Sequence, residues 1–288
     1  MNIRELINKG IETISVSFPE REAREMVLLY LEDVHGIKRL THILEPSFEV
    51  PSEIMQEAQD AFARMASGEP IQYIIGKAHF YGREFNVSPS VLIPRPETEV
   101  LCREVLNHRS GQSGPKVLDM CTGSGCIAWT LALEMPGADV VAVDISEGAL
   151  TIAGTQDFAG EISKTGALSP HFIKADVLGD IPSALSSFDI IVSNPPYVMD
   201  SEKALMRTNV LDHEPHLALF VPDSDPLLFY RAVARWASAL LSPDGFGVVE
   251  INEALGPQTA EVFRTAGFSK VVVVQDLNDR DRFVRFSR

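Results

Sequence analysis

The feature that most constrains the fold is a regular alternation of strand-like and helix-like segments from Lys116 onward. Apolar runs typical of buried strands are "KVLDMC", "DVVAVDI", "HFIKADV" and "FDIIVSN". Helix-like segments, "CIAWTLALEM" and "EGALTIAGTQDF", lie between the first three of them. Strands that alternate with helices pair in parallel, with helices on both faces of the sheet. The sequence therefore predicts an α/β fold with a doubly wound, mostly parallel sheet.

The last third of the chain predicts an antiparallel end to this sheet. A helix over "PLLFYRAVARWASALL", a strand over "GFGVVEIN" and a helix over "QTAEVFRTAGF" precede two closing strands, "KVVVVQDL" and "DRFVRFS". These strands are joined around Asn278 and Asp279. A link this short between neighbouring strands requires an antiparallel hairpin.

Residues 1–68 have helical periodicity and predict a small all-α domain. Apolar residues recur at three- and four-residue spacing in "IRELINKGIETI", "EREAREMVLLYLEDV" and "SEIMQEAQDAFARMA". Residues 69–95 predict a linker, in which Ile71 to Val87 form a β-hairpin around Tyr81 and Gly82. The remaining domain, 96–288, opens with a helix at Pro96, because proline is preset for a first helical turn.

Composition narrows the classes of partner. The chain of 288 residues is 45% hydrophobic and carries a formal net charge of −15, which argues against duplex nucleic acid because phosphate binding needs a basic surface. Its three cysteines form neither an even framework nor a C-x-x-C pair and predict reduced thiols. The sequence has no signal peptide and no run of eighteen apolar residues, so we expect a cytoplasmic protein without a membrane segment.

A glycine-containing turn, "LDMCTGSGCIA", follows the first strand of the alternating region and opens a helix. Gly123 and Gly125 let the backbone turn tightly, so that a nucleoside ligand can lie against a helix N-terminus. Asp144 ends the next strand, where a carboxylate can accept hydrogen bonds from both ribose hydroxyls. Because Gly123-x-Gly125-x-x-Ala128 also fits the dinucleotide fingerprint, these residues leave a nicotinamide-dependent oxidoreductase open.

Two further carboxylates favour S-adenosylmethionine as the cofactor. Asp119, at the end of the first strand, suits a ligand with an ammonium and a sulfonium group and would repel a pyrophosphate. Asp176 closes "KAD" at the same edge of the sheet, where it could accept a hydrogen bond from the exocyclic amine of adenine.

The stretch "SNPPYV" ends the fourth strand and predicts an acceptor site. Pro195 pushes Asn194 to an extended backbone, and the two prolines fix φ and carry no N–H. The side-chain oxygen of Asn194 and the carbonyl of Pro195 could accept both N–H bonds of a planar NH₂ group beside the cofactor. Pro196 stiffens this loop, and Tyr197 could stack on the target group.

These motifs together resemble one family. "NPPY", "DMCTGSG", "PRPETE" and "GEPIQYIIG", with "DHEPHLAL" and "DLNDRDRFVRF", are similar to the HemK/PrmC family of peptide release factor glutamine methyltransferases. The resemblance implies a class I S-adenosylmethionine-dependent methyltransferase domain behind a helical domain and a hairpin. It also implies methylation of the glutamine amide in the Gly-Gly-Gln motif of class I release factors. The residues it assigns to the cofactor are Cys121, Thr122, Gly123, Ser124, Gly125, Asp144, Asp176 and Val177; those it assigns to the target amide are Asn194, Pro195, Pro196 and Tyr197. We expect Asn194 to contact the cofactor as well.

The sequence departs from the family pattern at Cys121, where the family often has glycine. We expect a cysteine to fit there only with a negative φ. A second departure is "LFVPDSDPLLFY", which replaces a Gly-Gly-containing run. His213 and His216 are read as polar residues of a proline-flanked loop rather than as metal ligands.

Two alternatives to the amide methyltransferase remain besides the oxidoreductase. A nucleic-acid amine methyltransferase shares the chemistry of "NPPY" but predicts a basic surface near Tyr197. A non-catalytic module that only keeps the cofactor pocket would tolerate loss of Asn194.

Overall fold

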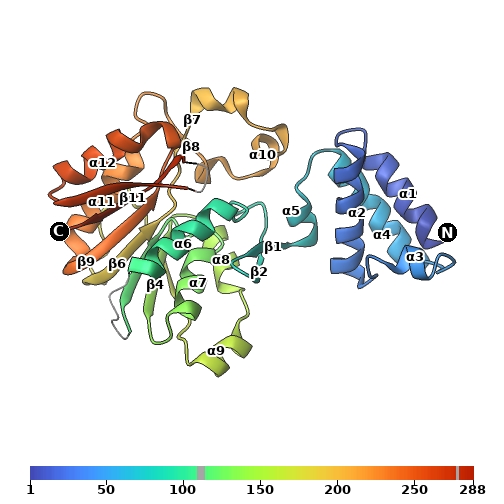
Figure 1. The fold of residues 1–288 in the computed structure, drawn as a ribbon, viewed down its shortest axis with the longest axis horizontal. Helices are drawn as coiled ribbons and strands as arrows, with labels where there is room; N and C mark the ends of the chain where they lie inside the picture. Colours follow the sequence, from blue (N-terminus) through green and yellow to red (C-terminus); the bar gives the residue numbers. More distant parts are fainter. Residues whose placement is uncertain (109–113, 277–278) are drawn as a thin grey trace. The chain divides into compact units, whose positions relative to one another are not determined.

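The computed structural model describes residues 1–108, 114–276 and 279–288, which form two compact units (Figure 1). One unit comprises Met1–Lys77 with Met206–Glu214, and the other comprises Ala78–Leu205 with Pro215–Arg288. The domain limits expected from the sequence, at residues 68 and 95, stay a prediction.

The first unit is helical, as the periodicity of the N-terminal region predicts. Its helices are α1 (Ile3–Ile14), α2 (Glu20–His35), α3 (Thr41–Leu44), α4 (Ser52–Ala66), α5 (Ile71–Ile75) and α10 (Thr208–His213). The α1 helix begins with a capping box, in which the Asn2 side chain accepts the Glu5 N–H and the Glu5 side chain accepts the Asn2 N–H. Gly10 allows α1 to pack closely, because a Cβ there would lie 2.7 Å from the ring of Phe62.

The predicted hairpin is present but shorter than expected. Its strands are β1 (Lys77–Phe80) and β2 (Arg83–Asn86), and Tyr81 and Gly82 form the turn with φ of 51° and 74°. Ile71–Ile75 is helix α5 instead of strand, because Pro70 starts a helical turn and Gly76, with φ of 79°, ends it.

The second unit is built on a seven-stranded sheet in the order β10-β11-β9-β6-β3-β4-β5. Its strands are β3 (Lys116–Met120), β4 (Asp139–Asp144), β5 (His171–Lys174), β6 (Phe188–Ser193), β9 (Leu241–Glu250), β10 (Lys270–Gln275) and β11 (Asp281–Ser287). Neighbours from β5 to β9 pair in parallel, and β11 pairs antiparallel with both β9 and β10. The predicted parallel sheet with an antiparallel end is confirmed. The expected turn at Asn278 lies outside the described residues.

The remaining elements connect or cover this sheet. Its helices are α6 (Pro96–His108), α7 (Cys126–Glu134), α8 (Glu147–Gly154), α9 (Ala159–Thr165), α11 (Leu228–Leu240) and α12 (Gly256–Thr265). Short elements are β7 (Val198–Met199), β8 (Phe220–Val221) and the 3₁₀ turns η1 (Asp200–Leu205), η2 (His216–Ala218) and η3 (Glu253–Leu255). As predicted, α6 begins at Pro96.

Alternate strand residues feed two apolar cores, one on each face of the sheet. On β9, Val248 packs into the core that includes α6 and α7, and Val249 packs into the core that includes α11 and α12. Phe283 and Val284 on β11 divide in the same way. This alternation places helices on both faces, as Figure 1 shows, and leaves the strand ends as the accessible edge.

Within the described ranges, no helix combines the length and apolar character needed to cross a membrane. The same ranges contain no group of three or more His, Cys, Asp or Glu side chains able to hold a metal ion.

Candidate functional site

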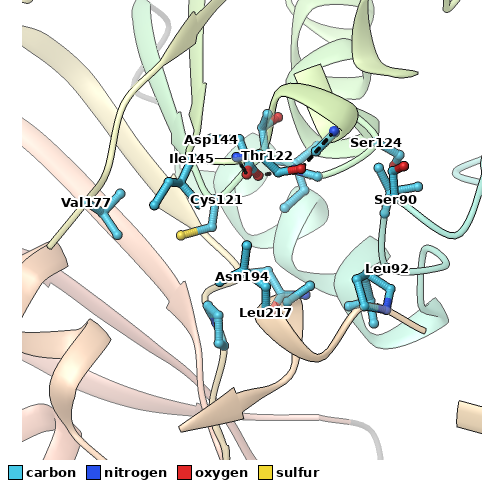
Figure 2. A pocket seen from close by; sticks show the side chains of 18 of the residues that line it. Ser90, Leu92, Cys121, Thr122, Ser124, Asp144, Ile145, Val177, Asn194 and Leu217 are labelled. Carbon is cyan, nitrogen blue, oxygen red and sulfur yellow. Dashed lines mark hydrogen bonds between the residues drawn. The ribbon is translucent and has the colours of Figure 1, made fainter. Parts of the chain in front are cut away.

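A pocket lies at the carboxyl edge of the sheet, where β3, β4, β5 and β6 end (Figure 2). It encloses about 1100 Å³ of space, its open mouth included. Parallel α/β sheets bind ligands at this edge, where the direction of strand order reverses. Of the residues predicted from the sequence, the pocket is lined by Cys121, Thr122, Gly123, Ser124, Asp144, Asp176, Val177, Asn194 and Pro196. Asp119, Gly125, Pro195 and Tyr197 are not among the lining residues.

Asp119 supports the glycine loop, residues 121–125, through a side-chain hydrogen bond. Its side chain is fully buried in β3 and accepts the hydroxyl of Thr122 at 2.6 Å. Burial raises the pKa of this carboxyl to about 7, and the hydrogen bond from Thr122 opposes that shift. Asp119 therefore fixes the loop in this structure, and the predicted contact with a cofactor ammonium stays a prediction.

The expectation for Cys121 is wrong. We expected a negative φ, but Cys121 has φ of 61° and is followed by Gly123 at 55° and Gly125 at 79°. The chain must turn from β3 into α7 within five residues while Thr122 N–H donates to Val143 O at 3.1 Å. This geometry imposes the left-handed conformation even on a side chain that disfavours it.

Asp144 connects the glycine loop to the end of β4. One carboxylate oxygen accepts the Gly123 N–H and the other accepts the Ser146 N–H, both at 2.9 Å. Burial raises the pKa of Asp144, and these two backbone donors partly offset that effect. Each carboxylate oxygen can accept a second hydrogen bond, so the site for two ribose hydroxyls remains compatible with the geometry.

Asn194 lies across the pocket from this loop (Figure 2), and its amide is held by α6. Its Nδ2 donates to Thr98 Oγ1 at 3.1 Å, and Thr98 Oγ1 donates to Glu250 Oε2 at 2.9 Å. Among the described residues, no donor bonds the Asn194 side-chain oxygen. The amide therefore offers an acceptor to a ligand.

Tyr197 is held by hydrogen bonds to Glu250 at the end of β9 and to Asn252. Its hydroxyl donates to Glu250 Oε1 at 3.0 Å, and its carbonyl accepts from the Asn252 side chain at 3.3 Å. Its ring packs against the core on the α11 side of the sheet. Burial and the nearby Glu250 raise the pKa of the Tyr197 hydroxyl. Stacking of this ring on a substrate stays a prediction.

Sequence reasoning missed two residues behind the site and several on its walls. Thr98 stands in the quoted "PRPETE", and Glu250 is the one charged residue of "GVVEI", a pattern that marks a buried carboxylate in an apolar strand. The missed wall residues include Ser90 and Leu92 before α6, Ile145 after β4, Leu217 in η2 and Phe229 in α11.

The strand order, the glycine loop and the carboxylate that ends β4 define a class I S-adenosylmethionine-dependent methyltransferase fold. Residues 5–76 match the family model described as PrmC N-terminal domain, and residues 96–217 match the one described as methyltransferase small domain. The chain is 36% identical to the release factor glutamine methyltransferase of Flavobacterium psychrophilum over 99% of both chains. It is 39% identical to that of Bacteroides thetaiotaomicron over 94% of this chain and 95% of the relative. It is 40% identical to the release factor glutamine methyltransferase of Koribacter versatilis over 96% of this chain and 94% of the relative. The chain belongs to the release factor glutamine methyltransferase family.

Proposed function

We propose that this chain methylates the side-chain amide of the glutamine in the Gly-Gly-Gln motif of class I release factors, with S-adenosylmethionine as methyl donor. The observation that carries the proposal is the direction of the Asn194 amide. Its NH₂ group donates to Thr98, which leaves its oxygen to accept from a ligand in the pocket. An acceptor in this place suits a target that offers N–H bonds.

The residues around the glycine loop fit S-adenosylmethionine. Gly123 borders open space, because a Cβ there would meet no atom within 4 Å, and a ligand can approach its backbone closely. Asp144 would hold the ribose, and the apolar side chains of Ile145 and Val177 offer walls for adenine. When bound, S-adenosylmethionine supplies an electrophilic methyl carbon attached to a sulfonium sulfur.

The Asn194 loop would compensate for the poor nucleophilicity of an amide nitrogen, whose lone pair is delocalised into the carbonyl. Asn194 Oδ1 and the Pro195 carbonyl would accept its two N–H bonds, which raises electron density on nitrogen and fixes the direction of attack. The methylated nitrogen is strongly acidic until it loses a proton. That proton leaves to water, so the loop needs to supply orientation but no general base.

The proposal includes release factors as protein partners and the cytoplasm as the compartment. The net charge of −15 supports a protein substrate over a nucleic acid, because phosphate contacts need a basic surface. A nucleic-acid amine target would use the same acceptors, so it is the rival that an experiment must separate.

The test is methyl transfer from methyl-labelled S-adenosylmethionine to separate substrates: a class I release factor, the same factor with its motif glutamine changed to glutamate, tRNA, and duplex DNA. We expect one methyl group on the motif glutamine, located by peptide mass spectrometry, and none on the glutamate variant. Label confined to tRNA or DNA would support a nucleic-acid amine methyltransferase instead. Label on none of the substrates would support a non-catalytic module that only binds the cofactor.

A further inference from the structure

A chain of buried hydrogen bonds lies behind the Asn194–Tyr197 loop and joins it to two other elements. Thr98, in the first turn of α6, is 2% exposed, and Glu250, the last residue of β9, is 1% exposed. The chain runs from Asn194 Nδ2 to Thr98 Oγ1 at 3.1 Å and from Thr98 Oγ1 to Glu250 Oε2 at 2.9 Å. Glu250 Oε1 then accepts the Tyr197 hydroxyl at 3.0 Å. The carboxylate therefore bridges the two ends of the loop.

The donor and acceptor of each of these hydrogen bonds can be assigned in only one consistent way. An ionised carboxylate can only accept, and a threonine hydroxyl has a single proton. Thr98 must give that proton to Glu250, so its oxygen can only accept from Asn194. The asparagine must then turn its NH₂ group toward Thr98 and its oxygen toward the pocket.

The order requires an ionised Glu250, the form that predominates above about pH 7. Burial raises its pKa to about 7, while the Thr98 and Tyr197 hydrogen bonds and the charge of Arg282 oppose the shift. The two hydroxyl donors occupy both of its oxygens. While Glu250 is ionised, no other arrangement of these protons satisfies the carboxylate and the threonine together.

We propose that Thr98 and Glu250 are positioning residues that orient the Asn194 amide, so that its oxygen, rather than its NH₂ group, faces the substrate. The inference rests on the proposed function, because an acceptor is needed only if the target offers N–H bonds. Without these two residues the Asn194 amide can rotate by 180°, so that its own NH₂ group, which cannot accept, faces the N–H bonds of the target. The target would still bind through the rest of its surface, but its nitrogen would lose one of two acceptors.

The test compares Thr98→Val, which keeps the shape and removes the hydroxyl, with Thr98→Ser, which restores the hydroxyl. Thr259→Val is the matched control, because Thr259 is also fully buried, in α12, and its hydroxyl has no hydrogen-bond partner among the described residues. The measurements are kcat and KM for a release factor, cofactor Kd by calorimetry, and solvent exchange of the Asn194 side-chain N–H signals by NMR. The exchange measurement uses the cofactor-free protein.

We expect Thr98→Val to lower kcat by about 10- to 100-fold, the cost of a misplaced reacting group, with KM and cofactor Kd within about twofold. The Asn194 N–H signals should exchange about 5- to 10-fold faster, because their acceptor is gone. Thr98→Ser should recover most of both losses, and Thr259→Val should change neither.

Unchanged kcat and unchanged exchange in a folded Thr98→Val protein would overturn the proposal. So would an equal loss in Thr98→Ser, which would point to packing alone. If Thr98→Val does not fold, Thr98→Ser is compared with Glu250→Leu, which removes the acceptor of the Thr98 hydroxyl, and wild-type exchange in Glu250→Leu would overturn the proposal. If the wild-type protein methylates no release factor, the proposed function fails while the exchange data still test the orientation.

Discussion

The two loops that face each other across the pocket are held in different ways. The Cys121–Gly125 loop follows β3 and is held by bonds within its own segment, such as the Thr122–Asp119 hydrogen bond, and by Val143 and Asp144 of the adjacent β4. The Asn194–Tyr197 loop follows the adjacent β6 and is held by side chains from α6 and β9. The wall proposed for the cofactor is thus shaped by its own turn and the neighbouring strand, and the wall proposed for the substrate by a buried ionisable group from a distant part of the chain.

The largest effect should come from Asn194→Ala. Removing the acceptor proposed to contact the reacting nitrogen should lower kcat by about 100- to 1000-fold, the usual size for a group that stabilises charge at a reaction centre. Cofactor Kd, measured by calorimetry, should stay within about threefold, because the proposal assigns most cofactor contacts to the opposite loop. Equal losses in kcat and cofactor affinity would contradict a division of labour between the loops.

Glu250→Gln should change how stability depends on pH. The folded pKa of Glu250 is about 7 against an ordinary 4.5, so the folded state binds more protons than the unfolded state between these values. Stability from this group is therefore full below pH 4.5 and is lost as pH rises through 7. The shift corresponds to about 3 kcal/mol, so the variant should gain that much relative to wild type between pH 4.5 and 8.

The measurement is urea unfolding of both proteins across this pH range. Asp119 has a similarly raised pKa but is present in both, so its contribution cancels. The charged and titratable groups that act on Glu250 are Glu97 and Cys102 on α6, Cys126 on α7, Tyr197, Tyr230 on α11 and Arg282 on β11. Stability curves that stay parallel would show that Glu250 keeps an ordinary pKa.

Gly123→Ala should affect the other loop and mainly cofactor binding. The new methyl group would meet no protein atom but would enter the space beside the backbone, at a φ of 55° that costs about 1 kcal/mol for alanine. We expect cofactor Kd to rise about tenfold and kcat at saturating cofactor to change little. Gly36→Ala is the control, since Gly36 has φ of 67° with nothing near it and lies in the helical unit. A loss of affinity in both variants would indicate strain alone.

The smallest effect should come from Cys121. Cys121→Gly relieves the positive φ, whereas Cys121→Ala keeps it, so the glycine variant should be more stable than the alanine variant by about 1 kcal/mol. Thermal unfolding measures this difference. An alanine variant at least as stable as the glycine variant would mean that the loop does not strain the cysteine.

The sequence predicts most of the fold because the patterns it depends on are local. Alternating strands and helices, the Pro96 helix start and the Gly123 turn are each specified within a few residues. The buried hydrogen bonds behind Asn194 could not be found from local patterns. Thr98 and Glu250 are 152 positions apart, and their contact depends on packing of α6 against the end of β9. The positive φ of Cys121 was missed for a related reason. The short connection from β3 to α7 imposes it, although a cysteine prefers a negative φ.

The insertion of β11 between β9 and β10 has a consequence for a chain still being synthesised. The edge of β9, the strand that ends at Glu250, has no neighbour on that side until residues 281–287 have left the ribosome. A nascent chain can therefore complete its glycine loop early, but Arg282, whose charge acts on Glu250, arrives only with β11. The wall proposed for the substrate should therefore be complete only after β11 has joined the sheet.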